Sequence, residues 1–159
     1  LLKDYRQAND ASKDLLTKKG ISTDDRSIAF LVLGKSQQVA NDCNAAVGSF
    51  KSAAAINKAA WGAEARFEMA NCFLLLGNTG AAEKAAMAVI KETGSYDIWV
   101  TKAYILLGDI FMLQKDYFNA KATYESVAKN STIVELKNEA QQKFEKAIEE
   151  EKQHSKIGN

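Results

Sequence analysis

The chain has 159 residues, enough for one domain with a sizeable core, and 47% of them are hydrophobic while 26% are charged. This balance excludes an intrinsically disordered tail. The 21 basic and 20 acidic residues leave a net charge of +1, so the chain has no broad positive field for nucleic acid or anionic lipid. The longest apolar run, residues 28–34, is far too short for a membrane span. We therefore expect neither nucleic-acid binding nor direct membrane insertion.

The chain contains no proline and much Ala, Lys, Glu and Leu, so it should be mostly helical with short connections. Helical periodicity, interrupted by Gly, Asn and capping residues, predicts eight helices. In chain order their expected ranges are 2–19, 24–40, 42–56, 60–76, 79–92, 97–114, 117–129 and 133–153. Because the chain starts with Leu1-Leu2 and shows no signal-like segment, we expect it to be a piece of a longer protein.

The clearest repeat occupies residues 97–130. It combines the pattern aromatic-x2-Leu-Gly-x2-aromatic with a following Ala-x3-aromatic, which defines a helix–turn–helix repeat of about 34 residues. The glycine lets a second helix approach the first closely, and the alanine offers the matching small surface. The residues in these positions are Tyr104, Leu107, Gly108, Phe111, Ala120 and Tyr124.

The same pattern recurs towards the N-terminus at steps of 38 and 36 residues. Residues 60–94 carry Met69-Ala70 in place of Leu-Gly, and Ala86 in place of the last aromatic. Residues 24–57 contribute Phe30, Leu33, Gly34, Ala46 and Phe50. Three matches in register predict three consecutive helix hairpins.

The two ends of the pattern are incomplete. Residues 1–20 place Tyr5 and Ala8 in the register of a second helix, which predicts half a repeat. Residues 132–153 begin with the capping-box pair Thr132 and Glu135 and carry one apolar stripe, as expected for a helix that closes a solenoid. The sequence thus predicts a single domain over residues 1–159, with a half repeat, three repeats and a capping helix.

These matches resemble the tetratricopeptide repeat family over nearly the whole chain. The resemblance implies an all-α, right-handed superhelical solenoid of antiparallel helix hairpins, and the C-terminal portion of a longer bacterial protein. It also implies a concave groove lined mainly by the first helix of each pair. The candidate peptide-binding residues are then Leu31, Lys35, Phe67, Asn71, Leu74, Ile105, Asp109 and Met112, with Val39 beside them.

Two interpretations of these groove residues stay open. The apolar members would either contact a ligand or be buried against neighbouring helices, and the polar ones could simply be solvated. A groove with Leu31, Phe67 and Ile105 does not suit a clamp for a C-terminal carboxylate, which in this family uses Lys, Arg and paired Asn. It suits an amphipathic helix or an extended segment with hydrophobic anchors.

The sequence offers little for catalysis. His154 is the single histidine, and there is no glycine-rich phosphate loop, nucleophile elbow or Cys-His pairing. Cys43 and Cys72 lack metal-ligand spacing, and they should lie on helices that pack side by side. They would form either a disulfide or two buried free thiols, of which the free thiols are favoured. We expect no enzyme activity, no cofactor and no metal site.

The function expected from the resemblance is a scaffold that binds a protein or peptide partner in its groove, and the resemblance also points to a bacterial envelope assembly. A periplasmic or outer-membrane-associated location would follow. Two alternatives stay open. The piece could be a structural end-cap or self-associating module of a longer repeat protein. It could also be the recruiting module of an enzyme encoded in a preceding region.

Overall fold

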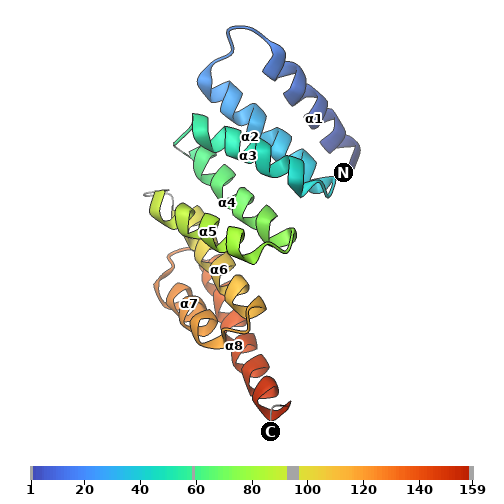
Figure 1. The fold of residues 1–159 in the computed structure, drawn as a ribbon. Helices are drawn as coiled ribbons and strands as arrows, with labels where there is room; N and C mark the ends of the chain where they lie inside the picture. The colour runs from blue at the N-terminus through green and yellow to red at the C-terminus, as the bar shows by residue number, and fades with distance from the viewer. Residues whose placement is uncertain (1, 59, 93–96, 158–159) are drawn as a thin grey trace. The chain divides into compact units, whose positions relative to one another are not determined.

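The computed structural model describes residues 2–58, 60–92 and 97–157, and every regular element within those ranges is an α helix. The helices are α1 (Leu2–Thr17), α2 (Thr23–Val39), α3 (Cys43–Ile56), α4 (Ala60–Leu75), α5 (Thr79–Glu92), α6 (Asp97–Leu113), α7 (Tyr117–Asn130) and α8 (Val134–Ile157) (Figure 1). All eight predicted helices and the all-α class are confirmed. The largest difference in bounds lies at the end of α8, which continues to Ile157 because no helix breaker occurs before Gly158.

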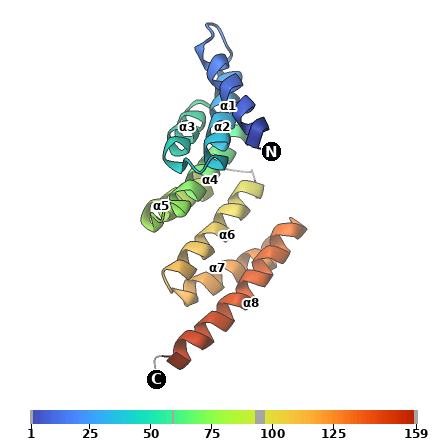
Figure 2. The same ribbon diagram turned by 90° about the vertical axis from the view of Figure 1, so that its right-hand side faces the viewer.

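The helices form two compact units, each a series of antiparallel hairpins. Residues Leu1–Tyr96 form the first unit, and in it each of α1 to α4 packs against the next helix while α2 also contacts α4. Residues Asp97–Asn159 form the second unit, in which α7 packs between α6 and α8 and these two also touch (Figure 2). The sequence predicts one domain over the whole chain, whereas the structure groups the helices into these two units.

The turn inside each hairpin has the same construction in all three repeats. One residue in the left-handed region reverses the chain: Asn41 (φ 61°), Gly77 (φ 73°) and Lys115 (φ 59°). The next residue caps the following helix by accepting a hydrogen bond from a backbone N–H three positions on. These caps are Asp42 to Ala45 (3.0 Å), Asn78 to Ala81 (3.1 Å) and Asp116 to Asn119 (3.1 Å).

Close contact between the helices of a hairpin depends on a size match. A Cβ atom at Gly34 would lie 2.6 Å from Phe50 Cδ1, so only glycine fits beneath that ring. Gly108 and Tyr124 repeat this arrangement in the second unit. The middle hairpin instead has alanine at both equivalent positions, 70 and 86, and both side chains are fully buried. The first and third hairpins thus place a ring over a glycine, and the middle hairpin places two small side chains opposite each other.

Candidate functional site

Each first helix of a hairpin ends in an exposed aliphatic residue. Val39 is the last residue of α2, Leu75 of α4 and Leu113 of α6, and they are 39%, 64% and 64% exposed. They are separated by 36 and 38 residues, the steps that relate the repeats themselves. The turn begins directly after them, so no following helical turn covers their side chains. We call Val39, Leu75 and Leu113 the terminal aliphatic residues.

The predicted groove residue Lys35 pairs with a neighbouring first helix. Its ammonium lies on Glu64 of α4, and one turn later Gln38 donates a hydrogen bond of 3.4 Å to Glu68. The Glu64 side chain is 12% exposed and the Lys35 side chain 42%, so this pair lies at the edge of the first unit. Lys35 thus holds α2 to α4, a role that periodicity alone did not indicate.

Two of the predicted groove residues are buried in the structure, which corrects their assignment to the groove. Leu31 is 3% exposed and belongs to the core cluster between α2, α3 and α4, and Ile105 is 4% exposed and packs with α7 and α8. Neither side chain can contact a ligand, because both are covered by the helices packed around them. The buried alternative for the apolar members holds at these two positions.

Asp109 also lies within a network of the protein's own side chains. Its Oδ1 accepts hydrogen bonds from the Tyr124 hydroxyl (2.5 Å) and from Lys143 Nζ of α8 (2.7 Å). Burial raises the pKa of Tyr124 well above its ordinary value, and the hydrogen bond to Asp109 raises it further. Tyr124 is therefore a neutral donor at physiological pH, and the three groups connect α6, α7 and α8.

A cavity of about 320 Å³ opens beside this network in the second unit. The aliphatic side chains of Met112 and Leu113 line it on α6, opposite charged residues of α8. Lys146 Nζ lies 3.5 Å from Glu150 Oε1, one turn further along α8, so these two charges also compensate each other. The full lining is Asp109, Met112, Leu113, Tyr124, Lys143, Lys146 and Glu150.

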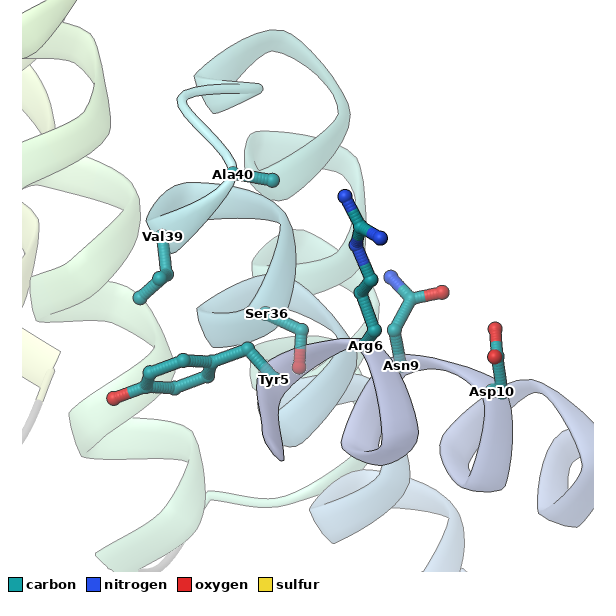
Figure 3. Close-up of a pocket in the computed structure, with 7 residues that line it drawn as sticks. All are labelled: Tyr5, Arg6, Asn9, Asp10, Ser36, Val39 and Ala40. Carbon is teal, nitrogen blue, oxygen red and sulfur yellow. The ribbon is translucent and has the colours of Figure 1, made fainter. Parts of the chain in front are cut away.

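The first unit has a larger cavity, of about 480 Å³, between α1 and α2. Figure 3 shows the Tyr5 ring lying beneath Val39, with Arg6 and Asn9 side by side on α1. One terminal aliphatic residue, Val39, thus lines this cavity as Leu113 lines the other. The remaining lining residues are Asp10, Ser36 and Ala40.

The other predicted groove residues are half-buried. Phe67, Asn71 and Leu74 follow one another on α4 of the first unit, and Met112 shares the second-unit cavity with Asp109. Leu75 and Leu113 were missed. The repeat spacing could have found them, because Leu75 lies 36 residues after Val39 and Leu113 lies 38 residues after Leu75.

Among residues 2–58, 60–92 and 97–157, no group of three or more His, Cys, Asp or Glu side chains is placed to hold a metal ion. Over the same ranges, no helix is both long enough and apolar enough to cross a bilayer.

Solved structures with the same fold include two crystal structures of MamA and one of BtubC (BKLC) from P. vanneervenii. One MamA structure gives a TM-score of 0.65 at 23% identity, covering 97% of this chain and 92% of that chain. The other gives 0.62 at 23% identity, covering 97% and 86%. BtubC gives 0.68 at 15% identity, covering 98% and 75%. No family model matches the chain, and the search of curated proteins gives no match either. These likenesses support the helical-repeat fold.

Proposed function

We propose that this chain is a non-enzymatic scaffold that binds a peptide or protein segment through the ends of its first helices. The observation that carries the proposal is the recurrence of the terminal aliphatic residues. Core packing demands apolar residues at buried positions, but it does not demand one at the same exposed position of every repeat. Val39 and Leu113 also line cavities, and exposed aliphatic side chains are what a partner with hydrophobic anchors needs.

The charges around these residues define the partner further. Lys35 and Asp109 are engaged with Glu64 and with Lys143, so neither offers a free charge to a ligand. The partner would gain affinity mainly from burying its own apolar side chains against Leu75 or Leu113, with polar groups at the rim. An amphipathic helix or an extended segment with aliphatic or aromatic anchors has that chemistry.

Selection from a random peptide display library against the immobilised chain tests this function. Peptides enriched on the wild type should bind Leu75→Glu at least about tenfold more weakly, because a hydrophobic anchor site becomes charged. Met87→Glu is the matched control, since Met87 is 40% exposed but lies on the second helix α5. Equal loss in both variants, or none in Leu75→Glu, would contradict the proposed surface.

Phe67→Glu examines the predicted groove separately. We expect it to abolish binding of the selected peptides while the helical circular dichroism is kept. Loss of the helical signal would instead place Phe67 in the core.

Self-association is the second candidate, and an apolar groove between α7 and α8 favours it. Phe118, which is 76% exposed, lines this groove together with the half-buried side chains of Phe144 and Ile148, and its volume is about 310 Å³. A dimer seen by sedimentation that Phe118→Glu dissociates would support this candidate. A monomer at all concentrations would exclude it.

The envelope location stays a prediction, which fractionation of the source cells would test. The role as a recruiting module for an enzyme needs the sequence of any preceding region.

A further inference from the structure

The two cysteines of the chain meet in the core of the first unit. Cys43 is the first residue of α3 and is 7% exposed, and Cys72 lies within α4 and is fully buried. Both belong to one cluster of packed side chains that also contains Ala46, Phe50 and Ala65. The two thiols therefore come from consecutive hairpins, 29 positions apart in the chain.

The thiols are free, and both are buried in this cluster. Burial raises the pKa of Cys72 far above its ordinary value, and its hydrogen bond with Cys43 raises it further. Cys72 is fully enclosed, so a reagent in solution cannot reach it directly. Its reaction partner within the cluster is the Cys43 sulfur, and Cys43, which is 7% exposed, directly follows the exposed turn residues 41–42.

We propose that Cys43 and Cys72 form a dithiol pair that closes to an intramolecular disulfide when a small disulfide oxidant is present, and so fastens α3 to α4. The Cys43 thiol loses its proton to solvent, and the thiolate attacks the oxidant, forming a mixed disulfide and expelling one thiol. Cys72 then gives up its proton and attacks Cys43 Sγ, which expels the second thiol. Two protein thiols are oxidised, and one oxidant disulfide is reduced to two thiols.

The bond would act on the candidate binding surface as well as on stability. Helix α4 carries Phe67, Asn71 and Leu75, and the bond would hold this helix against α3 at one fixed position. The disulfide itself is independent of the proposed function, because it concerns core residues and needs no partner.

The test measures the thiol–disulfide equilibrium of the native chain in buffers of oxidised and reduced glutathione. Samples are quenched with N-ethylmaleimide in urea, so that both cysteines can react, and their masses are measured by intact mass spectrometry. We expect a monomer lighter by two hydrogen atoms and carrying no maleimide. The effective concentration of the two thiols should be on the order of a hundredfold higher in the folded chain than in urea, because the fold holds them together.

Other outcomes overturn the proposal. These are two maleimides on the native chain at every redox ratio, glutathione left on Cys43, dimers joined through cysteine, or an effective concentration no higher than in urea. Cys43→Ser and Cys72→Ala are the controls. Neither should form the internal bond, and neither should show the rise in melting temperature that oxidation gives the wild type.

Discussion

The ring of Tyr124 lies directly on the backbone of Gly108, where an added Cβ atom would be 2.4 Å from Tyr124 Cε1. Phe50 covers Gly34 in the same way, 74 residues earlier. The middle hairpin replaces both members of the pair by Ala70 and Ala86. Two hairpins therefore pair a glycine with a large ring, and the middle hairpin pairs two small residues.

This relationship predicts strong coupling between positions 108 and 124. Gly108→Ala should cost about 1–3 kcal/mol by overpacking, and Tyr124→Ala about 3–5 kcal/mol by leaving a cavity. In the double variant, the methyl group at 108 should cost little, because the pair then matches the middle hairpin. Urea unfolding of the four proteins gives the coupling energy.

Gly48→Ala is the control, since no atom lies near its Cβ position. It should raise the stability by about 0.5–1 kcal/mol. Additive costs at positions 108 and 124 would contradict the size match.

Tyr124 should also make the fold sensitive to alkali. Below about pH 10 its hydroxyl is neutral in the folded and unfolded chains, so it gives no pH dependence there. At higher pH the unfolded chain releases this proton, while the folded chain keeps it because burial and Asp109 raise the pKa of Tyr124. Stability should then fall by up to about 1.4 kcal/mol per pH unit.

The measurement is the urea midpoint of the wild type and of Tyr124→Phe on either side of about pH 10. Lysines and other groups titrate in both proteins, so the difference between the two slopes isolates Tyr124. The phenylalanine variant should lose less stability in alkali. Parallel slopes would show that Tyr124 ionises as easily in the folded chain as in the unfolded one.

Lys115 occupies a turn position that favours glycine. Its φ of 59° lies in the same left-handed region as the φ of 73° at Gly77, the equivalent turn residue. Unlike glycine, Lys115 has a side chain, which disfavours the left-handed region. Lys115→Gly should therefore raise the stability by about 1 kcal/mol, and Gly77→Ala should lower it by about as much. Thermal melts of both variants test this pair. A loss of stability in Lys115→Gly would mean that the entropy of the unfolded chain outweighs the strain in the turn.

The repeats were predictable because their signals are local. Gly108 and Tyr124 are placed by spacing alone, and the turn at Lys115 follows from the Asp116 cap. The pairing of groove residues was not predictable in the same way. Lys35 meets Glu64 and Asp109 meets Lys143 across helices, and such pairs depend on the rotation of each helix about its axis.

The terminal aliphatic residues show a second limit. Positions three and four residues apart lie on the same face of a helix. From Asn71 and Asp109, the step of three leads to Leu74 and Met112, which are half-buried, and the step of four leads to Leu75 and Leu113, which are exposed. Periodicity alone cannot tell which of the two residues is exposed. The end of the helix decides it, because Leu75 and Leu113 are the last helical residues before the turn.

The network around Asp109 leads to a last prediction, which separates a structural role from ligand binding. Asp109→Ala should lower the free energy of unfolding by about 1–3 kcal/mol, because the buried Tyr124 hydroxyl loses its acceptor. Lys35→Ala should cost at most about 1 kcal/mol. Its side chain is 42% exposed, so solvent already screens its charge. Urea unfolding compares the two. In a Tyr124→Phe background the cost of Asp109→Ala should shrink, since the orphaned hydroxyl is gone. If Asp109→Ala leaves stability unchanged in both backgrounds, the carboxylate does not hold the helices together, and ligand contact becomes its better explanation.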